Sequence, residues 1–144
     1  MGSIPSGIGN LVSLEDFEVW NNEFSSFIPD RIRELQNLVV LALNNNRFSG
    51  HIPSSVGNLM NLIQLLLQYN NFSGRIPSNL SKCKNLLGLD LSWNNFSGSI
   101  PPEVLSLSSL SIYLDLSENS LTGTLPMEVG NLKGLGEFDV SGNK

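Results

Sequence analysis

Hydrophobic and polar positions recur along this chain with a period of about 24 residues. The clearest copy, residues 89–101, reads L-x-L-x-x-N-x-F-S-G-x-I-P, and residues 41–53 and 65–77 repeat it. Looser copies occupy residues 17–29 and 114–126, and partial copies open and close the chain. The aligned asparagines follow one another at steps of 24, 24, 24, 25 and 24 residues; they are Asn22, Asn46, Asn70, Asn94, Asn119 and Asn143. A fixed period in this range predicts a solenoid of about six stacked units.

The first part of each unit predicts a short β-strand. Leu89 and Leu91 alternate with other residues, and a period of two places one face of a strand in the core and the other in water. Successive units should therefore stack their strands into one parallel sheet on the concave side of the coil. Asn94 follows the strand, and we expect its amide to pair with backbone groups exposed there. The six aligned asparagines then form a structural ladder.

The second part of each unit predicts a turn followed by extended backbone. Phe96 is expected to fill the core behind the ladder, and Gly98 permits a tight turn. Pro101 fixes its own φ and favours extended backbone at the residue before it.

The last part of each unit predicts a single turn of helix on the convex side. Residues 102–107 suggest one helical or 3₁₀ turn with Val104 and Leu107 pointing inward. The fifth unit carries one extra residue within positions 110–114. This insertion predicts a bulge just before the strand, or a wider convex turn.

The L-x-G-x-I-P segment closely resembles the plant-type leucine-rich repeat, and the resemblance covers essentially the whole chain. That repeat occurs in the ectodomains of plant receptor-like kinases and receptor-like proteins, and in polygalacturonase inhibitors. The resemblance implies an α/β solenoid wound as a right-handed superhelix, with a second small sheet beside the concave one. Ser26 replaces the expected glycine in the first of these second strands. The second strands are expected near residues 25–28, 49–52, 73–76, 97–100 and 122–125.

Composition restricts the classes of partner. The chain of 144 residues is long enough to bury a continuous core, and we interpret residues 1–144 as a single solenoid domain. No apolar run approaches the ~20 residues of a membrane span. The net charge is −5 and the basic residues are scattered, which excludes nucleic acid as a partner. Cys83 is interpreted as a small buried hydrophobe, and His51 is the only histidine, so no metal or cofactor site is expected.

The two ends of the chain resemble interior repeats. No signal peptide precedes the first repeat, and neither end carries the paired cysteines with which the family usually caps its solenoids. We therefore expect an excised fragment of a longer protein, without terminal caps. Open end faces near Ile4 and Ile8, and near Phe138 and Val140, are expected to promote end-to-end association.

Aligning the strands predicts which side chains share the concave face. A weakly polar patch with flanking aromatic residues, and an acidic run beside it, are candidates for a partner surface. The acidic run has two interpretations, because aspartate at that strand position is also frequent in the repeat itself and can serve solubility and hydrogen bonding only. The candidate ligand-binding residues are Trp20, Val40, Ala42, Leu66, Tyr69, Trp93, Asp90, Tyr113 and Asp115.

Catalysis is poorly supported by the sequence. Paired carboxylates need a desolvated pocket for acid–base chemistry, whereas this face should be open. The chain has no Ser-His-Asp set and no phosphate-binding glycine loop followed by a helix. Arg31 and Arg33 fall on the convex side, so the carboxylate-binding role of paired concave arginines in some family members is not carried over. Three N-x-S sequons mark possible N-glycosylation at Asn71, Asn79 and Asn95.

The resemblance implies a binding function. The chain is identified as a segment of the extracellular region of a plant receptor-like kinase, on the outer side of the plasma membrane or in the apoplast. It would bind a peptide, a protein or a co-receptor on its concave face. The implied parent has a membrane span and a Ser/Thr kinase domain. Alternatives are a secreted inhibitor of polygalacturonase, an ice-binding repeat protein and a purely structural scaffold.

Overall fold

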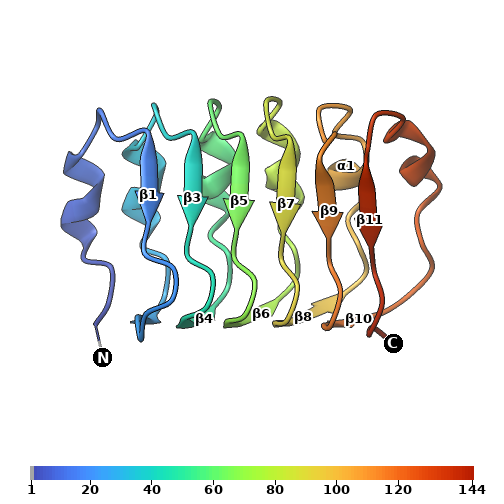
Figure 1. Cartoon of the computed structure of the whole chain (residues 1–144), viewed down its shortest axis with the longest axis horizontal. Helices are drawn as coiled ribbons and strands as arrows, with labels where there is room; N and C mark the ends of the chain where they lie inside the picture. The colour runs from blue at the N-terminus through green and yellow to red at the C-terminus, as the bar shows by residue number, and fades with distance from the viewer. Residues whose placement is uncertain (1) are drawn as a thin grey trace.

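The alternating leucines form one strand in each turn of a coil, and these strands lie side by side in a parallel sheet (Figure 1). The computed structural model describes residues 2–144; Met1, the first residue of the predicted domain, lies outside them. The order β1-β3-β5-β7-β9-β11 follows the chain, as expected for a solenoid. The six strands are β1 (Asp16–Glu18), β3 (Val40–Ala42), β5 (Gln64–Leu66), β7 (Gly88–Asp90), β9 (Tyr113–Asp115) and β11 (Glu137–Asp139).

A second parallel sheet confirms the plant-type architecture, in the order β10-β8-β6-β4-β2. Its later strands begin about two residues before the predicted positions, and the last lies wholly before residues 122–125. The prediction placed the glycine turn before the strand, whereas Gly50, Gly74 and Gly98 end their strands with φ near +77°. The strands are β2 (Ser25–Ser26), β4 (Arg47–Gly50), β6 (Asn71–Gly74), β8 (Asn95–Gly98) and β10 (Ser120–Leu121).

Ser26 keeps the same turn without glycine. Its φ is +79°, a left-handed value that costs an L-residue on the order of 1–2 kcal/mol. The turn therefore retains the shape of the other units despite the substitution.

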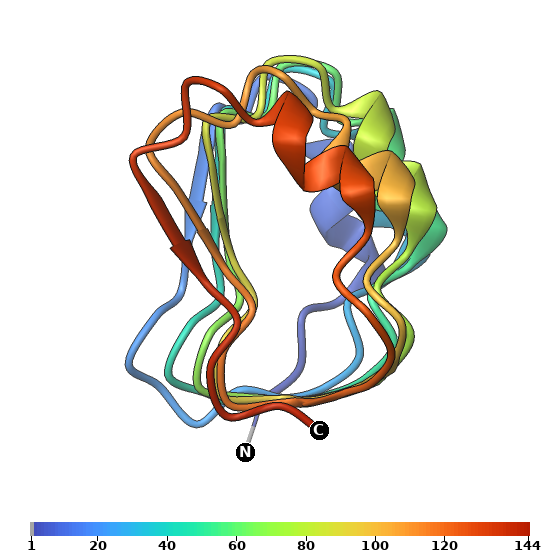
Figure 2. The same ribbon diagram turned by 90° about the vertical axis from the view of Figure 1, so that its right-hand side faces the viewer.

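Short helices cover the side opposite the six-stranded sheet, and the second sheet closes the coil between them (Figure 2). Val104, Leu105 and Leu107 are buried around the single α-helical turn. The helices are the 3₁₀ segments η1 (Ser6–Asn10), η2 (Asp30–Glu34), η3 (Ser54–Asn58), η4 (Ser78–Lys82) and η5 (Met127–Asn131), and the α-helix α1 (Pro102–Leu105). No helix in residues 2–144 is long and apolar enough to span a membrane.

The core is a stack of similar layers. The leucines at the core-facing strand position, Leu41, Leu65, Leu89 and Leu114, are fully buried, and the phenylalanines Phe24, Phe48, Phe72 and Phe96 stack with ring centroids 6.1–6.3 Å apart. Cys83 occupies a leucine position in the core, and burial raises the pKa of its thiol to about 11. The thiol is therefore protonated at neutral pH and packs as a small apolar group.

The aligned asparagines connect each turn of the coil to the one before it. Asn94 Nδ2 donates to the Leu67 carbonyl of the preceding turn at 3.0 Å, and Asn94 Oδ1 accepts from the Phe72 amide at 3.0 Å. The same amide also donates to the carbonyls of Leu91 and Ser92 in its own turn. Asn46, Asn70, Asn119 and Asn143 repeat this pattern. Asn22 is exposed, and within residues 2–144 its Nδ2 donates only to carbonyls of its own turn.

A second, shorter asparagine ladder was not anticipated from the sequence. Nδ2 of Asn37, Asn61 and Asn85 each donates, at 3.0 Å, to a carbonyl 25 residues earlier in the chain. Ser109 occupies the corresponding position in the next turn, and its hydroxyl is buried with no hydrogen-bond partner within residues 2–144. A serine side chain is too short to reach the preceding turn, which explains why the ladder stops there.

The extra residue of the fifth unit forms a bulge just before β9. The amides of Ser111 and Ile112 both donate to the Leu87 carbonyl, and Tyr113 then pairs with Gly88. The core register is therefore preserved, with Leu114 beside Leu89, and Ile112 is displaced outward to an exposed position.

Replacing Asn94 by alanine is expected to lower the free energy of unfolding by about 1–3 kcal/mol. The Phe72 amide loses its hydrogen-bond partner, whereas the Leu67 carbonyl loses one of two donors and still accepts from Asn70 Nδ2. Urea denaturation followed by circular dichroism measures the change. Asn95→Ala, at an exposed neighbour, is the control and should cost less than about 0.5 kcal/mol. Equal effects of the two substitutions would contradict the ladder.

Extending the second ladder should stabilise the chain. In Ser109→Asn the new amide is placed to donate to the Lys84 carbonyl, by analogy with Asn85, and a hydrogen bond of this kind contributes about 1 kcal/mol. Ser108→Asn, at an exposed position, is the control and should leave the urea midpoint unchanged. Bacterial expression is required because Ser109→Asn creates a glycosylation sequon. No gain, or a loss, in the midpoint of Ser109→Asn would refute the explanation.

Candidate functional site

The solvent-facing side of the six-stranded sheet, here called the concave face, presents its side chains in regular columns. The strand register aligns one column through the middle of the face, composed of Glu18, Ala42, Leu66, Asp90, Asp115 and Asp139. A second column contains Asp16, Val40, Gln64, Gly88, Tyr113 and Glu137. Neighbours in a column are about 5 Å apart, so side chains remote in sequence meet on this surface.

A hollow of mixed polarity occupies the first half of the concave face and is here called the apolar hollow, because it contains the apolar side chains of the predicted patch, Val40, Ala42 and Leu66. Trp20 is half exposed at its edge, where the indole Nε1 donates to Glu18 Oε2 at 3.0 Å. Ala42 is only 2% exposed, so it forms the floor of the hollow and contributes little area of its own. The lining residues are Glu18, Trp20, Val40, Ala42, Asn44, Gln64 and Leu66.

An acidic hollow occupies the second half and shares Leu66 with the first. Its lining residues are Leu66, Gln68, Asp90, Tyr113, Asp115 and Glu137. Burial of the carboxylate, together with the charges of Asp115 and Glu137, raises the pKa of Asp90 above its usual value; hydrogen bonds from Ser92 act in the opposite direction. This part of the surface therefore carries closely spaced negative charge that a cation can neutralise.

One oxygen of each aspartate in this run is used by the backbone. Asp90 Oδ1 accepts from the Ser92 amide at 3.0 Å and from the Ser92 hydroxyl at 2.7 Å. Asp115 and Asp139 each accept from the amide two residues later, at 2.9 and 2.8 Å. That hydrogen bond lowers the pKa of Asp139. These hydrogen bonds at the strand end thus account for one carboxylate oxygen of each aspartate. The second carboxylate oxygen takes no part in them.

The Tyr113 ring lies across Gly88 of the preceding strand. A Cβ atom on Gly88 would lie 2.7 Å from Tyr113 Cζ, so only glycine leaves room for the ring in this position. Burial, and the charge of Asp90, raise the pKa of the Tyr113 phenol. Tyr113 therefore forms an aromatic wall of the acidic hollow.

Tyr69 and Trp93 form a separate exposed pair just beyond β5 and β7. Their rings stack at a centroid distance of 5.5 Å, and each residue is about half exposed, 50% and 49%. Both residues have left-handed backbone, with φ of +56° and +52°, at the position where Asn21 and Asn45 stand in earlier turns. Asparagine tolerates this conformation, whereas bulky residues rarely adopt it. The chain thus has two large aromatic residues at a left-handed position that Asn21 and Asn45 occupy in the first two turns and Glu118 and Gly142 in the last two.

The structure separates the predicted patch into three parts. Trp20, Val40 and Leu66 line the apolar hollow, Asp90, Tyr113 and Asp115 line the acidic hollow, and the Tyr69–Trp93 pair lines neither. Five lining residues were not among the predicted candidates: Glu18, Asn44, Gln64, Gln68 and Glu137. The side-chain oxygens Asn44 Oδ1 and Gln68 Oε1 are buried without a hydrogen-bond partner within the described residues. Only the alignment of the columns could have indicated that Asn44 and Gln68 line the hollows, because amide side chains are common in this chain.

Other predicted residues lie away from the concave face. Arg31 and Arg33 are in η2 on the convex side, as expected. Asn71 and Asn95 are exposed at the starts of β6 and β8, whereas Asn79 in η4 is half buried. Within residues 2–144, no group of three or more His, Cys, Asp or Glu side chains is arranged to hold a metal ion.

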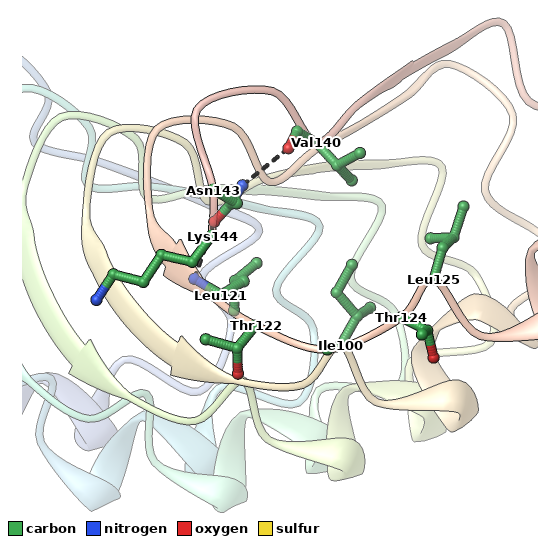
Figure 3. Close-up of a pocket in the computed structure, with 9 residues that line it drawn as sticks. Ile100, Leu121, Thr122, Thr124, Leu125, Val140, Asn143 and Lys144 are labelled. Carbon is green, nitrogen blue, oxygen red and sulfur yellow. Dashed lines mark hydrogen bonds between the residues drawn. The ribbon is translucent and has the colours of Figure 1, made fainter.

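A further hollow lies at the C-terminal end face, beside Ile100, Leu121 and Val140 (Figure 3). The Asn143 amide donates to the Val140 carbonyl at its edge. Of the residues predicted to form open end faces, Ile4 is buried, at 6% exposure, because it packs into the core of the first turn, and Ile8, Phe138 and Val140 are half buried. The more exposed apolar side chains near the two ends are Leu11, Val12, Leu125 and Met127.

A family model for the leucine-rich repeat matches residues 37–59, 61–83, 85–109 and 112–132. The chain belongs to the leucine-rich repeat family. A search of curated protein sequences gave no match.

Solved structures extend the match to nearly the whole chain. The ectodomain of the receptor kinase GASSHO1/SCHENGEN3 from Arabidopsis thaliana, in complex with CASPARIAN STRIP INTEGRITY FACTOR 2, is 38% identical over 99% of this chain, with a TM-score of 0.98. The Arabidopsis receptor kinase HAESA, in complex with the peptide hormone IDA and the co-receptor SERK1, is 38% identical over 99% of this chain, with a TM-score of 0.78. The leucine-rich repeat protein LIC12759 of Leptospira interrogans is 36% identical over 99% of this chain and 35% of its own length, with a TM-score of 0.86.

This leucine-rich repeat chain spans 17% and 28% of the two receptor chains. The resemblance to plant receptor ectodomains inferred from the L-x-G-x-I-P segment is confirmed at the level of the repeat and the fold. The relatives that bind peptides do so as ectodomains far longer than this segment.

The left-handed backbone at Trp93 predicts an unusual order of stability among its variants. Trp93→Asn and Trp93→Ala both remove the ring and its contact with Tyr69, so they differ mainly in their tolerance of φ near +52°. We expect Trp93→Asn to be more stable than Trp93→Ala by about 0.5–1 kcal/mol, since asparagine is several-fold enriched in this conformation. Urea denaturation of the two variants measures the difference. Equal stabilities, or a more stable alanine variant, would contradict the strained backbone.

Proposed function

We propose that this chain is a ligand-binding segment of the extracellular region of a plant receptor-like kinase, and that it binds a peptide or protein partner on its concave face. The exposed Tyr69–Trp93 pair carries the proposal. Two large, half-exposed aromatic rings stand in a backbone conformation that bulky residues rarely adopt, at the position that Asn21 and Asn45 occupy in the first two turns. Aromatic side chains of this kind dominate the binding energy of protein interfaces.

The structural relatives support a peptide or protein as the ligand class. The receptor kinase HAESA was solved with a peptide hormone and a co-receptor, and the GASSHO1/SCHENGEN3 ectodomain was solved with CASPARIAN STRIP INTEGRITY FACTOR 2. In the proposed parent protein, a membrane span and a cytoplasmic Ser/Thr kinase domain follow the ectodomain. This segment contributes binding and no catalysis, and receptor pairing on the outer side of the plasma membrane transmits the signal.

The proposed binding face can be tested with a phage-displayed library of random peptides. The 144-residue chain serves as bait, and enriched peptides are synthesised and titrated by fluorescence polarisation. Trp93→Ala and Leu66→Asn remove an aromatic ring and an apolar contact without changing the charge, and each is expected to weaken binding at least tenfold. Lys82→Glu on the convex side is the control and should bind as the parent chain does. Peptides that bind both concave variants unchanged would refute this face as the site.

Passage through the secretory pathway is part of the same proposal. Asn71 and Asn95 are exposed within N-x-S sequons and are proposed as glycan acceptors, and Asn79 is a third candidate. Secretion of the chain from plant cells, followed by enzymatic removal of N-glycans and mass spectrometry, tests this. An unmodified secreted chain would exclude all three sites.

We further propose that residues 1–144 form one folding unit without terminal caps, whose end faces associate in the isolated chain. Four apolar side chains near the two ends are between 47% and 88% exposed, which supports an apolar, self-associating surface at each end; they are Leu11, Val12, Leu125 and Met127. Sedimentation velocity over a range of concentrations tests this, and a monomer at the highest concentration would oppose it.

A further inference from the structure

Acidic and basic side chains are segregated between the faces of this chain. Six of the thirteen acidic residues lie on the concave face and a seventh, Glu118, lies just beyond β9; within residues 2–144 none of the eight Lys and Arg residues lies there. The face together with Glu118 therefore has a formal charge of −7, while the side chains elsewhere sum to +2. The seven acidic residues are Asp16, Glu18, Asp90, Asp115, Glu118, Glu137 and Asp139.

The basic residues occupy the other surfaces. Arg31, Arg33, Lys82, Lys84 and Lys133 lie in or next to the 3₁₀ turns on the convex side. Arg47 and Arg75 lie in or next to the second sheet, and Lys144 is the C-terminal residue. Single-sign charge across one face produces a field that attracts a partner of the opposite sign and rejects one of the same sign.

The acidic hollow has the chemistry to hold the end of a long cationic side chain. Asp90, Asp115 and Glu137 surround it with carboxylates, and Leu66 and the Tyr113 ring provide apolar walls. The methylene stem of an arginine or lysine can lie along such walls while its charged end meets the carboxylates. The Tyr113 ring adds a cation–π contact.

Gln68 adds an observation that is independent of the charges. It lines the same hollow, and its buried Oε1 has no hydrogen-bond partner among the described residues. Buried polar atoms of this kind normally have a partner, and this one is an acceptor that requires a donor. A guanidinium group has five N–H donors and no acceptor, so it matches the carboxylates of the hollow.

The Tyr69–Trp93 pair is close enough to the acidic hollow for one ligand to reach both. Asp90 and Trp93 are three residues apart, which limits their Cα separation to about 11 Å. An extended peptide covers that distance with about three residues. Glu118 follows Trp93 in the next turn of the same column, so negative charge continues beside the aromatic pair.

We propose that the ligand of the concave face is a cationic peptide. One arginine or lysine side chain enters the acidic hollow formed by Asp90, Tyr113, Asp115 and Glu137, and an aromatic or apolar side chain about three positions away lies on the Tyr69–Trp93 pair. This inference rests on the proposed function and narrows it to a class of ligand. The charge of the whole face, the donor-poor lining of the hollow and the nearby aromatic pair all favour this occupant.

The composition of the peptides enriched from the random library tests the inference. Peptides bound to the concave face are expected to be enriched in Arg or Lys with an aromatic residue about three positions away. For individual synthetic peptides, Asp90→Asn/Asp115→Asn should weaken binding about tenfold and reduce its dependence on salt. Both asparagines can still accept the backbone hydrogen bonds of Ser92 and Ser117, so the fold is preserved.

A control with the same change in net charge distinguishes a specific site in the acidic hollow from a general effect of the protein's negative charge. Glu103→Gln/Glu128→Gln removes two negative charges from the convex side and should leave affinity unchanged. Equal losses in the two double variants would overturn the acidic hollow as the site. Concave-face binders without a bias toward Arg or Lys would overturn the cationic ligand and leave the proposed function intact. A library that yields no binder on this face would overturn both.

Discussion

The structure depends on one repeated interaction, the asparagine side chain that bonds two turns of the coil at once. A strand of three residues cannot satisfy its own backbone groups, and the chain must leave the sheet immediately after it. Asn94 resolves this by accepting from the Phe72 amide and donating to the Leu67 carbonyl in the preceding turn. Because the bond joins neighbouring turns, no single unit can form it, and stability arises from stacking.

The same constraint creates the proposed binding surface. Stacking at a fixed period places equivalent residues of successive turns about 5 Å apart. The residues that differ between repeats at one position therefore form a column on the surface. Positions facing the core must stay apolar, whereas those on the concave face are free to vary. The apolar hollow, the acidic hollow and the Tyr69–Trp93 pair are three results of that freedom. The chain therefore combines a rigid scaffold with a variable face, as expected of a receptor segment.

Much of this architecture could be predicted from the sequence because periodicity determines it. The spacing of the asparagines places the strands, the ladder and the concave columns, and the inserted residue before Tyr113 predicts its bulge. The second strands begin earlier than predicted because their limits depend on local hydrogen bonds. The Phe72 amide donates to a ladder asparagine near the start of its strand, and Gly74 ends that strand. A period alone does not contain that information.

The candidate site was predicted less completely than the fold. The columns identify which residues share a face, but the directions of long side chains depend on their neighbours. Tyr113 lies across Gly88 because glycine leaves space there, and Tyr69 stacks on Trp93 rather than joining Trp20. The second asparagine ladder was not predicted, although Asn37, Asn61 and Asn85 recur every 24 residues, each directly before a buried leucine.

Native-state hydrogen exchange of the phenylalanine amides tests the central claim most directly. The amides of Phe48, Phe72 and Phe96 donate to ladder asparagines in the following turn. We predict that these three amides exchange slowly and with the same free energy, since opening any one of them requires the stacked turns to separate. Exchange as fast as that of exposed loop amides, or different free energies for the three turns, would show that the turns are stable without one another and would contradict the account.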